Sequence, residues 1–181
     1  MKVLVCSDIH GSAFYCDLLL KRIEEEKPDR IFLLGDILYH GPRNDLPKDY
    51  NPKKVIEMLN PLKDKIVAVR GNCEAEVDQM VLEFDCMSTF KEVDINGIHI
   101  VLTHGHHFNK RKPFDYPEKY VLLNGHFHVP EISDMGDFVY INDGSVSIPK
   151  NGSPHAYLVI EGKKFTLKNL ESSTDFDCIC L

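Results

Sequence analysis

The sequence predicts an α/β fold in which two mixed sheets face each other and helices lie outside them. The first half of the chain alternates short apolar runs with segments of helical periodicity, which is typical of a parallel sheet with covering helices. The second half carries short alternating runs separated by glycine-containing turns, which favours antiparallel strands. The chain has 181 residues, of which 43% are hydrophobic, and this is enough for one domain with a buried core.

The first half has the order strand, helix, strand, helix, strand. The expected elements are a strand at 2–8, a helix at 12–26, a strand at 30–36, a helix at 52–62 and a strand at 65–72. Ser12 is a suitable N-cap for the first helix. Residues 41–52 are a polar, proline-rich loop, and residues 69–76 have the pattern of a strand that runs into a sharp turn and then a helix.

The second half consists mainly of strands. The expected elements are a hairpin at 90–105 that turns at Asn96-Gly97, strands at 120–128 and 137–147, and a hairpin at 155–170 that turns at Gly162. A parallel layer should therefore be followed by a layer rich in antiparallel strands. We expect a single domain over residues 1–181, in which residues 171–181 are a loose tail.

Charge and composition exclude several classes of function. The formal net charge of −7 makes long nucleic acid an unlikely partner, although a local cationic or metal site can still bind a phosphate ester. No apolar stretch approaches the ~20 residues of a membrane span, and the first ten residues lack the pattern of a signal peptide. We therefore expect a cytoplasmic protein whose six cysteines are reduced. The CICL tail matches a prenylation pattern only in form, because no basic run precedes it.

Acidic, amide and imidazole side chains follow five of the expected strands. Ligands of α/β proteins bind at the carboxyl ends of strands, so these five ends can converge on one site. Residues two apart on an extended segment point the same way, so Asp8 can share a target with His10, and His126 with His128. The candidate ligands are Asp8, His10, Asp36, Asn72, His104, His126 and His128.

This set of donors favours a dinuclear metal site at the carboxyl ends of the strands. Four neutral nitrogens, two carboxylates and one amide oxygen are too many for one tetrahedral ion, and they suit two ions ~3.5–4 Å apart that share a carboxylate. Mixed imidazole and carboxylate ligands suit Mn, Fe, Zn or Co. A single Asp or His after a strand is more often a turn or cap residue, whereas five such motifs in one chain favour the metal site.

The ordered motifs D-x-H, G-D, G-N-x-[DE], H-G-H and G-H-x-H resemble those of the calcineurin-like metallophosphoesterase superfamily. The resemblance extends from Asp8 to about Ser145. The short chain without inserted caps, together with residues 39–52, resembles the YfcE-type phosphodiesterase branch. It implies a four-layer α/β/β/α sandwich and two divalent ions, first of all Mn²⁺, with Ni²⁺, Co²⁺, Zn²⁺ or Fe as alternatives.

The resemblance also implies a reaction and an assignment of ligands. The reaction is hydrolysis of phosphodiesters by in-line attack of a metal-bridging hydroxide, with little activity on phosphomonoesters. Asp36 would bridge the two ions. The first ion would be held by Asp8, His10, Asp36 and His128, and the second by Asp36, Asn72, His104 and His126.

Cys73 stands where the wider superfamily usually has histidine, and the YfcE-type branch commonly has cysteine there. A thiol beside cations should tend toward thiolate and should be a poor acid. We therefore expect weak turnover of esters with poor leaving groups and preference for diesters with acidic phenol leaving groups. Cys73 is expected to be neither a nucleophile nor half of a disulfide.

Four further side chains are candidate neighbours of the reaction. Arg43 and Asn44 are either phosphate contacts at the rim or part of a solvated loop. His106 and Cys73 are candidates for contact with the substrate or with the metal ligands. Glu74 has the position of a helix N-terminal carboxylate rather than of a catalytic base. Residues 142–145 should form a turn that backs the site.

Three other functions compete with that of a phosphodiesterase for a small diester substrate. An interaction scaffold has a precedent in the retromer subunit of the same fold, but a scaffold has no need to keep seven metal ligands. A nuclease or phosphoprotein phosphatase is disfavoured by the acidic charge and by the absence of histidine at Cys73. Exposed strands are compatible with a homo-oligomer.

Overall fold

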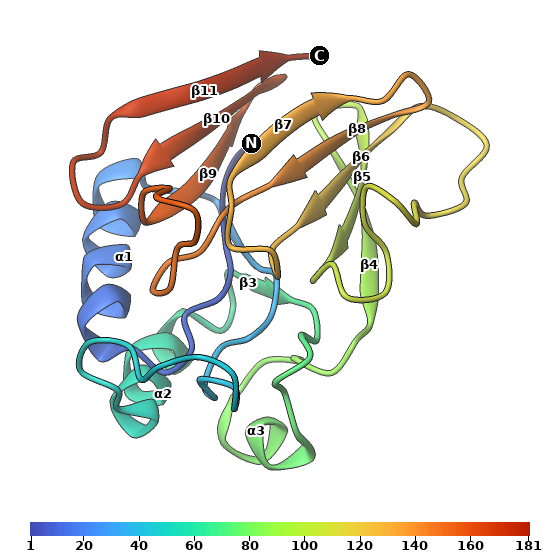
Figure 1. Cartoon of the computed structure of the whole chain (residues 1–181). Helices are drawn as coiled ribbons and strands as arrows, with labels where there is room; N and C mark the ends of the chain where they lie inside the picture. The colour runs from blue at the N-terminus through green and yellow to red at the C-terminus, as the bar shows by residue number, and fades with distance from the viewer.

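The computed structural model describes residues 1–181 and contains two mixed sheets that pack face to face (Figure 1). The six-stranded sheet has the order β11-β10-β9-β1-β2-β3, and the five-stranded sheet has the order β4-β5-β6-β8-β7. The strands are β1 (Lys2–Cys6), β2 (Arg30–Leu33), β3 (Ile66–Ala68), β4 (Phe90–Ile95), β5 (Ile98–Thr103), β6 (Tyr120–Asn124), β7 (Glu131–Asp134), β8 (Phe138–Asn142), β9 (Ala156–Glu161), β10 (Lys164–Asn169) and β11 (Asp175–Cys180). The α-helices are α1 (Ala13–Glu26), α2 (Pro52–Leu59) and α3 (Glu76–Val81).

The main hydrophobic cores follow from the alternation of side chains along the strands. On β1, Val3 and Val5 belong to the core between the two sheets, whereas Leu4 and Cys6 belong to the core under α1 and α2. All four side chains are fully buried. Full burial of an aliphatic side chain stabilises a fold by roughly 1.5–3 kcal/mol, so the central strand β1 is anchored on both faces.

The helical layer covers the outer face of the six-stranded sheet (Figure 1). The expected cap is confirmed, because the Ser12 hydroxyl accepts a hydrogen bond from the backbone N–H of Tyr15 at 3.3 Å. The outer face of the five-stranded sheet is covered differently. Its apolar side chains pack against Phe114 and Tyr116, which lie between β5 and β6, rather than against a helix. None of the helices is long and apolar enough to cross a membrane.

The division of strands between the sheets differs from the expected one. The strands β9 and β10 extend the parallel sheet instead of joining the second layer, because β9 pairs antiparallel with β1 at Val3↔Ile160. The expectation of a loose tail at residues 171–181 is wrong, since β11 pairs with β10 at Phe165↔Ile179. The unpaired backbone groups of β10 provide the edge to which this strand bonds.

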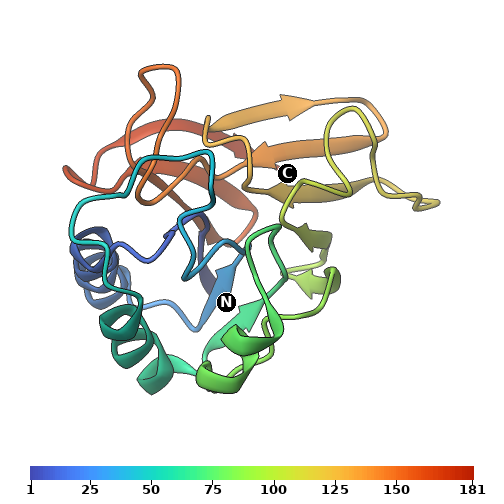
Figure 2. The same ribbon diagram turned by 60° about the horizontal axis from the view of Figure 1, so that its bottom comes forward.

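The carboxyl ends of the central strands meet at one edge of the sandwich. The strands β1, β2 and β3 run parallel, as do β5, β6 and β8. Backbone hydrogen bonds join the loops that follow them: Asp8 donates to Gly35 O at 3.0 Å and Gly125 donates to His104 O at 2.9 Å. Figure 2 turns this edge toward the viewer. The expected convergence of strand ends is therefore present in the fold.

Candidate metal centre

Five of the seven candidate ligands lie in the left-handed backbone region. Their φ angles are 55° for Asp8, 48° for His10, 55° for Asp36, 67° for His126 and 59° for His128. Non-glycine residues in this region cost on the order of 1–3 kcal/mol each and cluster at functional sites. Hydrogen bonds between adjacent loops hold the strained backbone in place, such as that from His10 N to Asp36 O at 2.9 Å.

Two glycines allow the loops to approach the candidate carboxylates closely. A Cβ on Gly71 would collide with the Asp36 carboxylate and lie 2.5 Å from Asp36 N. A Cβ on Gly125 would collide with Ser7 Oγ and lie 2.6 Å from Asp8 Oδ2. Any larger residue at either position would displace a carboxylate that the site needs.

Three of the candidate histidines are held in one tautomer by backbone carbonyl groups. The bonds join Nδ1 of His10 to Tyr39 O at 2.7 Å, Nδ1 of His104 to Leu34 O at 2.7 Å and Nδ1 of His128 to Ile148 O at 2.6 Å. A carbonyl only accepts, so each Nδ1 carries the proton and each neutral ring presents the lone pair of Nε2 to the site. This is the arrangement that metal-bound histidines require.

Ring nitrogens of four histidines and an amide oxygen face one another across the site. His10 Nε2 lies 3.4 Å from His128 Nε2, and His104 Nε2 lies 3.2 Å from His126 Nδ1. Asn72 Oδ1 lies 3.1 Å from His104 Nε2. Lone pairs at these distances repel unless a proton or a cation lies between them, so the donor set fits a bound metal ion.

Asp8 adds a carboxylate oxygen to the first pair of rings. Its Oδ1 is buried and has no hydrogen-bond partner, and it lies 3.0 Å from His128 Nε2 and 3.4 Å from His10 Nε2. Its Oδ2 is occupied, because it accepts from the backbone N–H of His126 at 2.9 Å. A buried carboxylate oxygen without a partner is costly, and a cation at this position would satisfy it.

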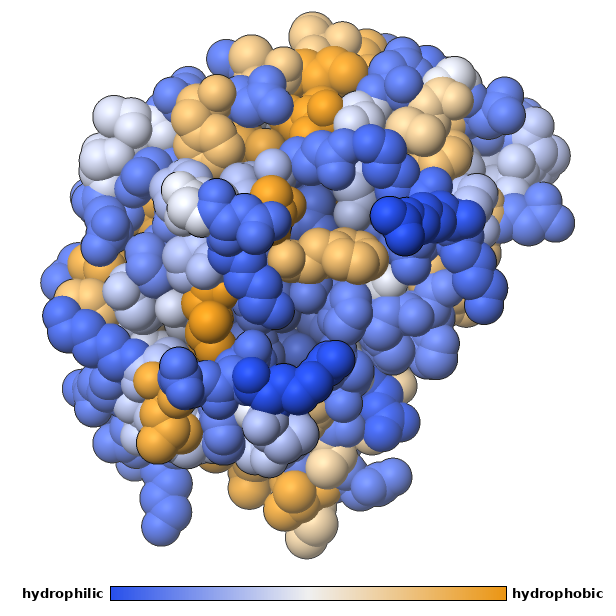
Figure 3. All heavy atoms as spheres, viewed as in Figure 1, coloured by the Kyte–Doolittle hydropathy of each residue, from blue (hydrophilic) through white to orange (hydrophobic).

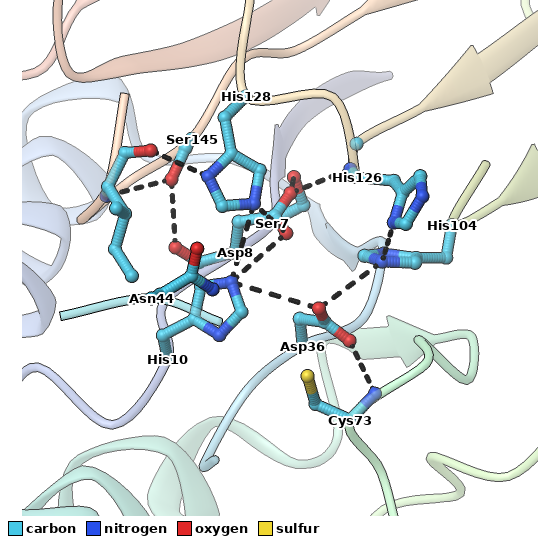
Figure 4. A network of polar contacts seen from close by, with 12 residues as sticks. Ser7, Asp8, His10, Asp36, Asn44, Cys73, His104, His126, His128 and Ser145 are labelled. Atoms are coloured by element: carbon cyan, nitrogen blue, oxygen red, sulfur yellow. Dashed lines mark hydrogen bonds and ion pairs between the residues drawn. The ribbon is translucent and has the colours of Figure 1, made fainter. Parts of the chain in front are cut away.

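Asp36 lies between the two groups of rings, as Figure 4 shows. Its Oδ2 is 3.7 Å from His10 Nε2 and 3.4 Å from His104 Nε2. Ligand atoms of Asp8, Asp36 and His104 lie within 4.8 Å of one another, and so do those of Asp8, His10 and His128. Asp36 therefore has the position that a bridging carboxylate needs.

The electrostatics of the site pair ionised carboxylates with imidazoles. Burial alone would lower the pKa of His104, but Asp36 and Asp8 raise it to about 9. Burial and the nearby His104 lower the pKa of His126 to about 4. The protein without metal thus places a proton on His104, where a divalent cation would compete with it.

Glu74 joins the loop after β2 to the loop after β3. Its buried carboxylate, 4% exposed, accepts hydrogen bonds from the backbone N–H groups of Asp36 at 2.9 Å, Ile37 at 2.7 Å and Gly71. The helix-terminal role expected for Glu74 is wrong, since α3 begins at Glu76. In the sequence, Glu74 stands out only as the acidic residue of the G-N-x-[DE] motif. The backbone groups that it binds are seen only in the folded structure.

The turn at residues 142–145 backs the site as expected. The Ser7 hydroxyl lies 2.6 Å from Asp8 Oδ2 and 2.8 Å from Asp143 Oδ1, and the Ser145 hydroxyl donates to Asp8 O at 3.1 Å. These bonds hold Asp8 from behind. Sequence reasoning did not single out Ser7, because a serine beside an aspartate has no distinctive pattern.

A family model for the calcineurin-like phosphoesterase superfamily domain matches residues 1–164. The chain belongs to this superfamily. The family implies divalent metal ions, and the donors described above fit them. In Escherichia coli strain K12, phosphodiesterase YfcE is 41% identical to this chain over 161 residues, which is 89% of this chain and 88% of YfcE.

Two solved structures have the same fold as this chain. A structure of YfcE, a phosphoesterase from E. coli, superimposes with a TM-score of 0.96 and 37% identity and covers 99% of each chain. A structure of Vps29 from Entamoeba histolytica with Zn²⁺ superimposes with a TM-score of 0.64 and 18% identity, over 100% of this chain and 98% of Vps29. The similarity to Vps29 shows a common fold only.

Cys73 lies beside the candidate metal ligands. Its backbone N–H donates to Asp36 Oδ1 at 2.9 Å, and Asn72 Nδ2 donates to Cys73 Sγ at 3.2 Å. Burial and the Asp36 carboxylate raise the pKa of the Cys73 thiol. The protein's own groups therefore favour the thiol and not the expected thiolate, and a thiol with a raised pKa is still a poor acid.

The donors open into a cavity of about 390 Å³. Arg43, Asn44 and Cys73 line it together with the candidate ligands Asp36, Asn72, His126 and His128. Asn44 Nδ2 donates to His40 O at 2.8 Å and so also stabilises its loop. Lys150 lines the cavity as well, although sequence reasoning did not select it. Figure 3, in the orientation of Figure 1, shows a hollow near the middle of the visible face, and strongly hydrophilic residues lie on its rim.

His106 lies apart from the other candidate substrate contacts. It lines a separate cavity of about 330 Å³, together with Arg70, Asn72 and Thr89, and its ring centroid lies 5.4 Å from that of His104. Burial and the nearby His104 lower the pKa of His106 to about 4, so its ring is neutral at physiological pH. The structure thus brings Arg43, Asn44 and Cys73 together and separates His106 from them.

Proposed function

We propose that this chain is a metal-dependent phosphoric diester hydrolase that acts on small phosphodiesters. The observation that carries the proposal is the set of ring nitrogens that face one another at the strand ends, together with the unpartnered Asp8 Oδ1. Membership of the phosphoesterase superfamily and the 41% identity to phosphodiesterase YfcE support the same reaction. We place this activity in the cytoplasm, as the sequence predicts.

Seven side chains would hold two divalent ions, with Mn²⁺ as the first candidate. One ion would be held by Asp8, His10, Asp36 and His128, and the other by Asp36, Asn72, His104 and His126. The short separations among Asp8, His10 and His128 support the first group. The position of Asp36 Oδ2 between His10 and His104 supports its bridging role.

Bound divalent ions would supply a Lewis acid for the phosphoryl oxygens and would lower the pKa of a water molecule. In the reaction, the oxygen of water bonds to phosphorus, the ester P–O bond breaks, and the alcohol or phenol leaves. The chain's own cations at the cavity, Arg43 and Lys150, make no ion pair and would offset the charge of the diester.

Cys73 would determine which leaving groups depart readily. A thiol with a raised pKa cannot protonate a leaving oxygen efficiently, so esters of acidic phenols should be cleaved fastest. The same position lacks the imidazole that the wider superfamily carries. We therefore propose little activity on phosphomonoesters.

The test is hydrolysis of bis(p-nitrophenyl) phosphate and p-nitrophenyl phosphate by metal-free protein supplied with single metals. We expect Mn²⁺ to restore diester hydrolysis and the monoester to react far more slowly. Asp36→Asn should lower diester turnover by about 10³-fold or more, because it removes the shared ligand. Asp64→Asn, an exposed aspartate outside the site, is the matched control and should behave as wild type.

An interaction scaffold is the alternative, given the fold shared with Vps29. The retention of all seven donors favours the enzyme. Purified protein that binds no metal, and shows no diester hydrolysis with any of Mn²⁺, Ni²⁺, Co²⁺, Zn²⁺ or Fe²⁺, would favour the scaffold instead.

A further inference from the structure

A second, larger groove adjoins the metal cavity. It has a volume of about 860 Å³, and Phe127 lines both the groove and the metal cavity. Its other lining residues come from the segment between β5 and β6, from the region around β7, and from β8, and they include Asn109, Lys110, Arg111, Lys112, Glu131 and Met135. A molecule bound at the metal donors can therefore extend past Phe127 into this groove.

One side of the groove offers an exposed apolar surface. Phe127 is 44% exposed although it lies between the candidate ligands His126 and His128, and Met135 is 40% exposed. An exposed aromatic ring next to a catalytic cavity can stack against a planar group of the substrate, and such base–aromatic stacking tolerates any base.

The other side of the groove is basic. Three consecutive cations, Lys110, Arg111 and Lys112, occur in a chain whose net charge is −7. Lys110 is engaged, because its ammonium bonds to Glu131 and lies 3.2 Å from Ser133 Oγ. The side chains of Arg111 and Lys112 have no hydrogen bond or ion pair, so both charges are available to a ligand.

The loop that carries these cations is held in place. The side-chain oxygen of Asn109 accepts hydrogen bonds from the backbone N–H of Arg111 at 2.9 Å and of Lys112 at 3.2 Å. Asn109 also donates to Gly105 O at 2.9 Å, which ties the loop to the segment after β5 that bears His104. The backbone that carries the two free cations is thus held near the segment that bears His104.

We propose that this groove binds the part of the substrate beyond the scissile ester and selects diesters of nucleotide type that carry a second phosphate. The planar base stacks on Phe127, and the second phosphate lies against Arg111 and Lys112. A guanidinium matches a phosphate with two parallel hydrogen bonds. A long nucleic acid is a poor ligand, because the net charge of −7 repels an extended phosphate backbone. This inference rests on the proposed phosphodiesterase function.

The experiment compares two chromogenic diesters that release the same p-nitrophenol from the same type of bond. They are the p-nitrophenyl ester of thymidine 5′-phosphate and its derivative with an additional 3′-phosphate. In the Mn²⁺-supplied wild type, we expect kcat/KM to be about tenfold higher for the 3′-phosphorylated ester, the effect of one or two charge-assisted hydrogen bonds. In the double variant Arg111→Ala with Lys112→Ala, this ratio should fall toward one.

The matched control removes two positive charges from the β9–β10 hairpin, which lies at the end of the six-stranded sheet away from the candidate metal ligands. The side chains of Lys163 and Lys164 make no ion pair. In the backbone register of the sheet, Lys164 lies opposite Glu161, which itself lies opposite Lys2 at the start of β1. The double variant Lys163→Ala with Lys164→Ala should keep the wild-type ratio. A ratio near one in the wild type, or a ratio that survives in the Arg111 and Lys112 variant, would overturn the inference.

A binding measurement separates failure of this inference from failure of the proposed function. Calorimetry should find thymidine 3′,5′-bisphosphate bound about tenfold more tightly than thymidine 5′-monophosphate, and the Arg111 and Lys112 variant should lose the difference. This difference in binding would support the groove even if no diester were hydrolysed. Absence of hydrolysis would then refute only the proposed function. Equal binding of the two nucleotides would overturn the groove even in an active phosphodiesterase.

Discussion

The backbone N–H of Asp36 donates to the carboxylate of Glu74 at 2.9 Å. Asp36 is the carboxylate that lies between the two groups of histidines, and Glu74 also accepts from the backbone of Gly71, next to Asn72. One buried carboxylate thus positions candidate ligands from two different strand ends. The precision of the metal site depends on a residue that is not itself a candidate ligand.

Glu74→Gln tests this positioning role. An amide has one acceptor oxygen instead of two and would place an NH₂ group against backbone donors, so we expect unfolding to become easier by about 1–3 kcal/mol. Mn²⁺ affinity measured by calorimetry should fall about 10–100-fold, as expected for residues that orient metal ligands. Glu76→Gln, on the exposed start of α3, is the control. Loss of stability with unchanged metal affinity would leave Glu74 a purely structural role.

Gly71→Ala tests the close approach of the loop after β3 to Asp36. The added Cβ would collide with the Asp36 carboxylate, so diester turnover should fall about 100-fold or more and metal binding should weaken with it. Gly97→Ala is the control, because a Cβ there meets nothing within 4 Å and adds only the strain of its positive φ, on the order of 1 kcal/mol. Wild-type turnover in the Gly71 variant would contradict the close contact.

Asp85 should make stability depend on pH in a defined range. Burial opposes ionisation, but Ser88, Lys91 and the backbone N–H of Met87 lower the pKa of Asp85 to about 2. Its folded pKa lies below its unfolded value, so its contribution is complete above about pH 5 and is lost as the pH falls through 2. The side chain is 51% exposed, and solvent screening reduces this contribution to ~0.5–1 kcal/mol.

Urea unfolding of wild type and Asp85→Asn measures this effect. The variant should be less stable at pH 7 by about that amount, and the difference should shrink toward zero near pH 2. Asp64→Asn is the control, because the Asp64 carboxylate makes no hydrogen bond or ion pair, and the stability of this variant should follow that of the wild type. A difference that stays constant with pH would show that the charge of Asp85 does not contribute.

Cys73→His tests the influence of this position on the leaving group. An imidazole can protonate a leaving oxygen near neutral pH, so the ratio of monoester to diester turnover should rise about tenfold or more. Cys73→Ser should keep the low ratio of the wild type, because a hydroxyl is an even weaker acid. An inactive serine variant would place Cys73 among the catalytic residues, and an unchanged ratio in the histidine variant would remove it from leaving-group selection.

Metal binding should stabilise the fold, because a cation would remove the repulsion between facing acceptor atoms such as His10 Nε2 and His128 Nε2. At a free Mn²⁺ concentration of 100 times Kd, we expect a gain of ~2.7 kcal/mol in the free energy of unfolding, and a chelator should reverse it. Thermal unfolding with and without Mn²⁺ measures this. Asp8→Asn should reduce the gain, and an equal gain in that variant would exclude Asp8 as a ligand.

Much of the fold was predictable because its signals are local. The Ser12 cap of α1 and the Asn96-Gly97 turn between β4 and β5 depend on neighbouring residues only, and both were expected. The edge strand β11 was missed because residues 175–180 alternate weakly and are mostly exposed, so only the free edge of β10 makes them a strand. The pairing of β9 with β1 was missed for a similar reason, since any apolar strand satisfies the local pattern.

By itself, the sequence determined which donor types follow each strand. The expected reason for Asp8 and His10 to share a target, an extended segment, is wrong, because β1 ends at Cys6 and both residues have left-handed backbone. The tertiary structure alone decided which of the donors meet. His10 faces His128 across 118 positions of sequence, Glu74 joins two loops through backbone groups, and Phe127 connects the metal cavity to a basic groove. Periodicity and residue type act over a few neighbours, whereas these contacts depend on sheet order and register, which only the packing of the whole chain sets.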